Sequence, residues 1–195
     1  MSQHQRLAPH IRIAHDLWER HVSPSDIAID MTVGNGHDTL FLSSILPLGQ
    51  VYGFDIQLQA IESTKKRVQN TSNVTLIHAS HETIDTIACP KPPSLIVYNL
   101  GYLPGGNKCM TTTAKTTLAS LKKAIALLAP NGMISITCYP GHDEGKKETD
   151  AVALFVDSLS HVVWDIETHL PPSSIMIKPR LHILIHRCSS LQGSQ

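Results

Sequence analysis

The segment Asn99–Gly106, which reads NLGYLPGG, places an asparagine and a tyrosine on a glycine-rich turn after the apolar run SLIVY. It contains no acid, histidine or serine that could act as an ordinary catalytic base. Asn99 could orient an amine by hydrogen bonding, and Tyr102 could pack against a flat ring, with Gly101 between them. The alternative for Tyr102 is a loop aromatic that fills the core. The segment favours a reaction that needs an oriented acceptor more than a strong base.

A second polar segment, DMTVGNGHDT, runs from Asp30 to Thr39 after the apolar run IAI. Its glycines, Gly34 and Gly36, would let the backbone approach a ligand that lies over the strand ends of an open α/β sheet. Asp55 closes the next apolar run, 19 residues after Gly36. A carboxylate at that distance can accept both hydroxyls of a ribose, so the two segments predict a nucleoside-containing cofactor.

Two cofactor classes share this arrangement. A dinucleotide site favours a third glycine, but Thr39 stands at that position, and Asp38 would lie where a pyrophosphate binds. A carboxylate there repels phosphate and complements the helix dipole. S-adenosylmethionine carries no phosphate, and its sulfonium and ammonium would be attracted by Asp30 and Asp38. The charges therefore favour S-adenosylmethionine, with a dinucleotide or a structural turn capped by Asp38 as alternatives.

Further candidate contacts follow later strand-like segments. Ser80 and His81 could grip an adenine, although His81 could equally be a surface residue at a helix start. Tyr139 and His142, in the segment YPGH, could contact the substrate, and His142 could accept a proton or cap a turn. Lys108 or Lys146 could contact an RNA phosphate. The other histidines show no ligand-like grouping, so we predict no metal.

Strand-like and helix-like segments alternate along the 195 residues, which predicts a mostly parallel sheet covered by helices on both faces. Two terminal strands without a helix between them predict a hairpin, with an antiparallel strand at or near the sheet edge. About seven strands with a late hairpin indicate the α/β, Rossmann-like fold of class I methyltransferases. We expect one domain over residues 1–188 and a disordered tail over 189–195. The expected strands span 27–31, 50–55, 73–78, 93–99, 133–139 and the hairpin 161–187, and the expected helical segments 9–21, 37–46, 58–68, 82–87, 112–128 and 146–159. On the helix 9–21, the apolar spacing predicts that Ile13, Leu17 and Val22 lie on the inner side.

The composition gives little support to a nucleic-acid partner, because 16 basic and 16 acidic residues leave no net charge. Short basic clusters at 65–67, 122–123, 146–147 and 178–180 are either solvated faces or RNA contacts. No apolar run approaches the roughly 20 residues of a membrane span, and the first residues do not look like a signal peptide. The four cysteines lie far apart, so we expect reduced thiols and a cytoplasmic protein.

Four segments, DMTVGNGHDTLFL, VYGFDIQLQAIEST, NLGYLPGGNKCMTT and CYPGHDEGKKE, together resemble the YtqB-like (MnmM) family, earlier described as rRNA methylases. The resemblance covers residues 10–187. Its members are described as tRNA 5-(aminomethyl)-2-thiouridine methyltransferases. The resemblance implies that S-adenosylmethionine is used to convert the 5-aminomethyl group of a wobble uridine, in the anticodon region of tRNA, to 5-methylaminomethyl.

The same resemblance implies roles for individual residues. Asn35 and its neighbouring glycines would line the methionine end of the cofactor, and Asp55 with the adjacent Ile56 and Gln57 would hold the ribose and adenine side. Ser80 and His81 would close over the adenine.

The acceptor loop resembles the Asn/Asp-Pro-Pro-Tyr/Phe motif of amino-methylating enzymes, with Leu-Gly in place of Pro-Pro. Asn99 would accept from the aminomethyl nitrogen, and Tyr102 would pack on the uracil. Asn107 stands where relatives commonly carry aspartate, which leaves a role for that side chain open. A homodimer joining two basic patches is one way for a neutral chain to hold RNA. An rRNA base, a small-molecule amine or a dehydrogenase reaction remain alternatives.

Overall fold

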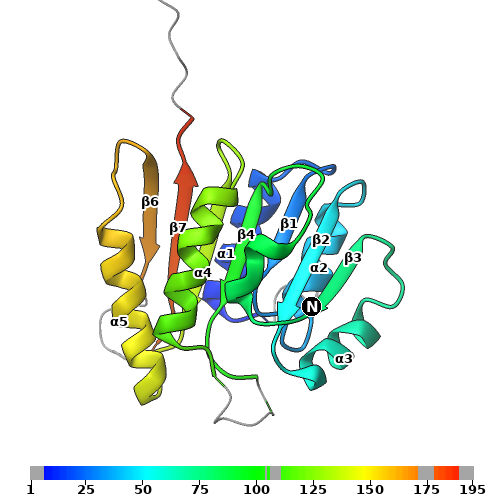
Figure 1. Cartoon of the computed structure of the whole chain (residues 1–195), viewed down its shortest axis with the longest axis horizontal. Coiled ribbons are helices and arrows are strands. Elements are labelled where there is room, and N and C mark those ends of the chain that lie inside the picture. The colour runs from blue at the N-terminus through cyan, green and yellow to red at the C-terminus, as the bar shows by residue number, and fades with distance from the viewer. Residues whose placement is uncertain (1–6, 104, 106–110, 171–177, 189–195) are drawn as a thin grey trace, which may run out of the picture.

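The computed structural model describes residues 7–103, 105, 111–170 and 178–188, and seven strands among them form one sheet (Figure 1). The predicted tail 189–195, Lys108 and Asn107 lie outside the described residues. The strands are β1 (Ile27–Asp30), β2 (Gln50–Asp55), β3 (Val74–His78), β4 (Leu95–Asn99), β5 (Met133–Cys138), β6 (Trp164–His169) and β7 (Arg180–His186). The helices are α1 (Pro9–His21), α2 (His37–Ile45), α3 (Leu58–Arg67), the 3₁₀ helix η2 (His81–Thr86), α4 (Ala114–Leu127) and α5 (Asp143–Asp157).

The sheet has the strand order β3-β2-β1-β4-β5-β7-β6. The first five strands pair in parallel, and β7 is antiparallel to both β5 and β6. The expected antiparallel strand near the edge is therefore confirmed as β7, the second strand from that edge. The chain winds from β1 outward through β2 to β3 and then returns to place β4 on the other side of β1. Ligands bind at such a switch point in open α/β sheets, outside the carboxyl ends of the strands.

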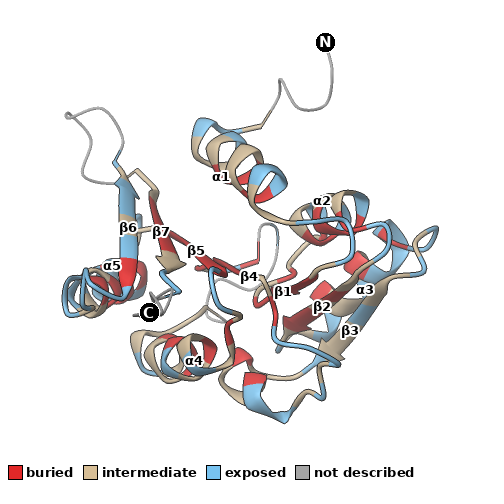
Figure 2. Cartoon of the chain, turned by 90° about the horizontal axis from the view of Figure 1, so that it is seen from above, coloured by how far each residue is buried: buried red, intermediate tan, exposed pale blue. Residues whose placement is uncertain are grey.

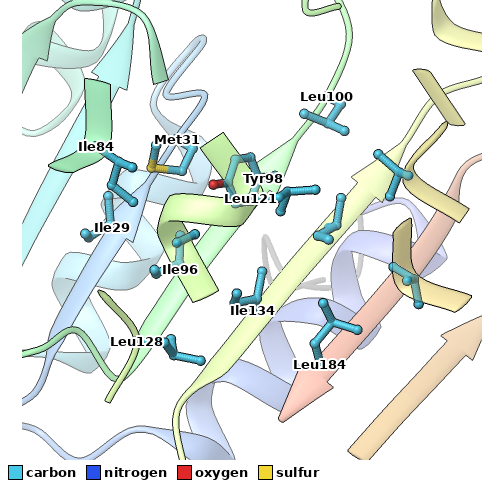
Figure 3. Close-up of a cluster of buried hydrophobic side chains, with 14 of the residues drawn as sticks. Ile29, Met31, Ile84, Ile96, Tyr98, Leu100, Leu121, Leu128, Ile134 and Leu184 are labelled. Carbon is cyan, nitrogen blue, oxygen red and sulfur yellow. The ribbon is translucent and has the colours of Figure 1, made fainter. Parts of the chain in front are cut away.

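Helices cover both faces of the sheet, as the view from above shows (Figure 2). On one face, α1 and α2 pack on the sheet through a cluster that includes Trp18, Leu42, Val97 and Ile183. On the other face, η2, α4 and α5 close the larger cluster, in which Leu121 of α4 packs among side chains of β1, β4 and β5 (Figure 3). Strands of a sheet that is covered on both faces are mostly apolar and buried, and β1, β4 and β5 follow this rule, with Ser135 and Thr137 of β5 as buried polar residues.

The inner side of α1 differs from the prediction. The sequence pattern put Ile13, Leu17 and Val22 on the inner side, and these residues are only partly buried. The deeply buried residues are Ala14 and Trp18, together with a histidine, His15. The buried stripe is therefore centred one position further along the helix, and it carries a polar group that an apolar pattern cannot reveal.

Two helices begin at residues other than those predicted, because capping side chains set their first turns. Thr113 accepts a hydrogen bond from the Thr116 N–H, so α4 begins at Ala114. His142 accepts from the Gly145 N–H, so α5 begins at Asp143, three residues earlier than expected. No helix within the described ranges is long and apolar enough to cross a membrane.

Candidate active site

A cavity of about 650 Å³ opens at the carboxyl ends of β1, β2 and β4, where the strand order reverses. It collects predicted site residues from segments far apart in the sequence. Those that line it are Gly34, Asn35, Asp38, Asp55, Ile56, Gln57, Ser80, His81, Asn99, Gly101, Tyr102, Tyr139 and His142. No lysine or arginine of the described part of the chain lines the cavity, whereas Asp38 and Asp55 do. The cavity is therefore acidic and suits a cationic ligand.

Three predicted cofactor-binding residues, Asp30, Gly36 and Thr39, lie behind the cavity wall and do not line it. Asp30 is buried, and its carboxylate accepts from the Thr39 hydroxyl at 2.6 Å and from the Thr32 N–H at 3.1 Å. Gly36 has a φ of 78°, and a Cβ there would lie 2.8 Å from the hydroxyl oxygen of Thr64. These residues shape the turn between β1 and α2, so a ligand would meet the turn and not these side chains.

Asp55 lies at the end of β2 with both carboxylate oxygens anchored. Oδ2 accepts from the Gly34 N–H at 3.1 Å, and Oδ1 accepts from the Gln57 N–H at 2.9 Å. Burial raises the pKa of Asp55, and these backbone hydrogen bonds oppose that rise. Each carboxylate oxygen retains a further lone pair, so the anchored group can still accept two hydroxyl hydrogens from a ligand.

Asn99, the last residue of β4, has a defined side-chain orientation. Its Nδ2 donates to Asp38 Oδ2 at 3.0 Å, and its backbone N–H donates to the Thr32 hydroxyl at 2.8 Å. A carboxylate only accepts hydrogen bonds, so the amide nitrogen must face Asp38. Asn99 Oδ1 is consequently the free end of the amide, and it is buried without a hydrogen-bond partner in the protein. Such an acceptor at a cavity wall suits a ligand that donates an N–H or O–H.

Tyr102 and His142 form one wall of the cavity, with ring centroids 5.4 Å apart. Tyr102 is 37% exposed, so it does not fill the core. The tyrosine that packs in the core is the fully buried Tyr98. His142 Nδ1 accepts from the Gly145 N–H at 3.1 Å, so in the neutral ring Nε2 carries the proton. In this state His142 can donate a hydrogen bond, and the geometry favours the capping alternative over a proton acceptor.

Ser80, His81 and Ile56 also line the cavity. Ser80 caps η2 by accepting from the Glu82 N–H, and His81 is buried, not a surface residue. Burial lowers the pKa of His81, against the raising effect of the nearby Glu82 charge. Ile56 is 47% exposed at the cavity edge. This part of the cavity wall combines an apolar edge with a neutral imidazole, which suits a flat heteroaromatic ring.

Four residues near the site were not predicted to act there, although two of them, Thr112 and Glu148, are the last residues of quoted segments. His10 and His15 reach it from α1, where His10 Nε2 shares a hydrogen bond of 3.0 Å with the Tyr139 hydroxyl. Thr112 and Glu148 brace the acceptor loop from behind. Histidines spaced five residues apart on a helix and a glutamate within a charged helix are common surface patterns, so only their burial identifies them.

Glu148 ties three elements together. Its carboxylate accepts from the Thr112 and Thr117 hydroxyls, each at 2.6 Å, and Thr112 in turn accepts from the Gly101 N–H at 2.8 Å. Burial raises the pKa of Glu148, while these hydroxyl donors oppose the rise. Through Thr112, the carboxylate thus holds the backbone of Gly101, which directly precedes Tyr102, in place.

We expect Glu148→Ala to lower the free energy of unfolding by about 2–4 kcal/mol, because it leaves the buried Thr117 hydroxyl and the partly buried Thr112 hydroxyl without their acceptor. Glu148→Gln retains one carbonyl acceptor and should lose less. Urea unfolding of the three proteins measures both values. An alanine variant as stable as the wild type would contradict the bracing role.

We expect the stability of the protein to depend on pH because of the buried carboxyl group of Asp30. Burial, reinforced by the nearby Asp38 charge, raises the pKa of Asp30 from 3.8 to about 7. The native state then binds this proton more tightly than the unfolded chain does. The contribution of protonated Asp30 to the free energy of unfolding is therefore complete below about pH 4, and it is lost as the pH rises through about 7.

Asp30→Asn removes this ionisation, and the Thr39 hydroxyl can reverse its hydrogen bond to accept from the new amide. The free energy of unfolding of the variant minus that of the wild type should increase by up to about 4 kcal/mol between pH 4 and pH 8. Urea unfolding at a series of pH values gives this difference. Parallel profiles for the two proteins would show that Asp30 has an ordinary pKa.

No group of histidine, cysteine, aspartate or glutamate within the described residues could hold a metal ion. The cysteines in the same part of the chain, Cys89, Cys138 and Cys188, are free thiols.

Comparisons with known proteins agree with this architecture. A crystal structure described as "putative rRNA-methylase from Clostridium thermocellum" is 33% identical, with a TM-score of 0.87 over 92% of this chain and 98% of that chain. A second, "SMU.1697c, a putative methyltransferase from Streptococcus mutans in complex with SAH", is 34% identical, with a TM-score of 0.83 over 92% and 99%. The predicted class I methyltransferase fold is confirmed.

A curated protein of Arabidopsis thaliana, "tRNA (mnm(5)s(2)U34)-methyltransferase, chloroplastic", is 37% identical over 165 residues. The aligned part is 78% of this chain, which spans 60% of the length of that relative. The model of a family described as "Putative rRNA methylase" matches residues 51–183. Since that match covers more than half of the chain, the protein belongs to this family, as the sequence resemblance predicted.

Proposed function

We propose that the protein is an S-adenosylmethionine-dependent methyltransferase that methylates the 5-aminomethyl group of a wobble uridine in tRNA. The observation that carries the proposal is the buried, unpartnered Asn99 Oδ1 in the wall of an acidic cavity. An acceptor without a partner at that place matches an amine N–H better than it matches a phosphate or a carboxylate.

The residues of the cavity fit S-adenosylmethionine. Asp55 can accept both ribose hydroxyls, and Ile56 and His81 offer a flat ring an apolar and aromatic surface. Asp38, in the first turn of α2, supplies negative charge where a dinucleotide would place its pyrophosphate. The absence of lysine and arginine among the described lining residues further disfavours phosphate groups.

When bound, the cofactor supplies a methyl group on a sulfonium. The protein supplies orientation, because Asn99 Oδ1 can hold one amine hydrogen and so aim the nitrogen lone pair. Tyr102 presents a partly exposed ring on which a uracil can stack. Desolvation in the cavity would lower the pKa of an alkylammonium, while the charges of Asp38 and Asp55 would raise it, so the amine would lose its first proton to water before or as it enters the cavity. Orienting the two reactants in this geometry can lower the activation barrier by roughly 7–11 kcal/mol.

The tRNA substrate is supported by the description of the Arabidopsis relative as a tRNA methyltransferase and by the loop NLGY. The family description, by contrast, names rRNA, which makes an rRNA base the second candidate acceptor. The relative is also described as chloroplastic, so we propose the cytoplasm as the location with an organelle as the alternative.

An RNA contact is available beside the cavity. Lys65, Lys66 and Arg67 form the last turn of α3, and Arg67 Nε donates to the carbonyl of Asn35 at 2.6 Å. Asn35 itself lines the cavity. We propose that this helix end contacts phosphates, and that a homodimer joins two such patches; a monomer in sedimentation analysis would exclude the dimer.

Calorimetric titration tests the cofactor assignment. We expect S-adenosylhomocysteine to bind to the purified protein with one site per chain and NADH to give no heat of binding. Binding of NADH without binding of S-adenosylhomocysteine would overturn the proposed function in favour of a dehydrogenase.

A further inference from the structure

We infer that His15, on the N-terminal helix α1, is a positioning residue for the proposed methyl transfer. Through Asp38, it holds the side-chain amide of Asn99 with its oxygen turned to the acceptor amine. The inference rests on the proposed function, because it concerns the residue that would orient that amine. It assigns a role in the reaction to a helix that lies outside every motif of the sequence.

Two consecutive hydrogen bonds carry the inference. His15 Nε2 donates to Asp38 Oδ1 at 2.7 Å, and Asp38 Oδ2 accepts from Asn99 Nδ2 at 3.0 Å. The side chains of His15 and Asp38 are only 4% and 13% exposed. Hydrogen bonds to a carboxylate in such a shielded place are stronger than neutral ones, so the chain of three side chains is well ordered.

The imidazole is itself held by ring contacts. His15 stacks on Phe41 of α2, with ring centroids 3.9 Å apart and planes 8° apart, and it lies 5.0 Å from Trp18. These contacts fix the ring plane, and the ring plane fixes the direction of the Nε2 hydrogen bond. The carboxylate of Asp38 therefore cannot rotate without losing its partner.

The orientation of Asn99 matters because its amide has a donor end and an acceptor end of nearly equal size. With Nδ2 on Asp38, the acceptor end is the one left for a ligand. If the amide turned over, two N–H groups would confront the hydrogens of the amine, and the lone pair would no longer be aimed at the methyl. A carboxylate that is free to rotate would permit this reversal, so His15 acts through Asp38 on Asn99.

A second contact places α1 over the same site. His10, five residues before His15, shares its hydrogen bond with Tyr139, whose ring lies in the cavity wall. Burial raises the pKa of Tyr139, so its hydroxyl stays neutral and available as a hydrogen-bond partner. The helix is thus tied to both β4 and β5 ends of the cavity.

The test compares His15→Leu and His15→Gln with the wild type in steady-state methylation of tRNA. We expect His15→Leu to lower kcat about 10-fold to 100-fold, with KM for tRNA and the dissociation constant for S-adenosylhomocysteine within about twofold of wild type. His15→Gln should restore most of kcat, since its amide nitrogen can take the place of Nε2 as donor. His161→Gln, at an exposed turn, is the matched control and should leave all three values unchanged.

A double-mutant cycle separates positioning from structural damage. In the Asn99→Ala background, His15→Leu should cause no further loss of kcat, because the side chain on which it acts is gone. Independent losses would overturn the inference, and so would a His15→Leu variant with wild-type kcat. If the leucine variant does not fold, His15→Phe retains the stacking on Phe41 and replaces it. An inactive wild type that binds cofactor would instead refute the proposed function.

Discussion

Replacing Asn99 by alanine is expected to lower kcat for tRNA methylation by about 100-fold to 1,000-fold, the range seen when one preorganised polar group of an active site is removed. The reason is that no other side chain described in the cavity offers a buried acceptor without a partner next to Asp38. The dissociation constant for S-adenosylhomocysteine should change less than about threefold, because the Asn99 amide acts on the acceptor. Single-turnover methylation and calorimetry measure the two quantities.

Asn70→Ala is the matched control for this variant, since Asn70 is exposed in the turn after α3 and lies outside the cavity. It should reproduce the wild-type kcat. If Asn99→Ala loses turnover and cofactor affinity by the same factor, Asn99 is a cofactor contact, and the assignment to the acceptor amine is wrong.

The second large effect is expected at Asp55. Asp55→Ala should weaken the binding of S-adenosylhomocysteine by about 10-fold to 100-fold, as expected when hydrogen bonds to a charged group are lost. The affinity of Asp55→Asn for S-adenosylhomocysteine should lie between those of the wild type and Asp55→Ala. The reason is that its amide nitrogen would face one of the two backbone N–H groups that now donate to the carboxylate. Calorimetry gives the affinities, and thermal unfolding shows whether each variant is folded.

Asp157→Ala serves as the control, since it removes an exposed carboxylate at the end of α5. Its affinity for S-adenosylhomocysteine should equal that of the wild type. An Asp55→Ala variant that is folded and binds with wild-type affinity would show that the ribose is not held at the end of β2.

Much of the fold could be predicted from the sequence because buried parallel strands are predominantly apolar. The runs that became β1, β4 and β5 are buried along their length, and the helices between them follow an apolar periodicity. The prediction was less accurate for the start of α5, which lies three residues earlier than expected. A histidine cap is unusual, and neither Pro nor a typical capping residue marks position 142.

The cavity could be predicted in part for the same reason. Residues that end neighbouring parallel strands must meet at one edge, so Asp55 and Asn99 share the cavity although 44 positions separate them. Asp30 ends a strand as well, but its carboxylate turns inward to Thr39. Which way a side chain turns at a strand end depends on partners from other elements, and sequence spacing does not contain that information.

The residues that support the site, His15 and Glu148, could not be predicted from the sequence, and the reason is physical. His15 and Glu148 lie on helices whose outer faces are polar, so a polar residue there gives no signal until its burial is known. Their partners come from distant elements, 23 residues away for His15 and 36 for the contact of Glu148 with Thr112. Buried polar networks of this kind are readable only after the fold has brought their members together.

The most direct measurement of the central claim uses tRNA from a strain in which the gene for this protein is deleted. Mass analysis of its nucleosides should find 5-aminomethyl-2-thiouridine in place of the methylated form. Incubation of that tRNA with the purified protein and S-adenosylmethionine should then produce 5-methylaminomethyl-2-thiouridine, and the Asn99→Ala protein should produce it far more slowly. Persistence of 5-methylaminomethyl-2-thiouridine in the deletion strain, with no second pathway present, would contradict the proposed function.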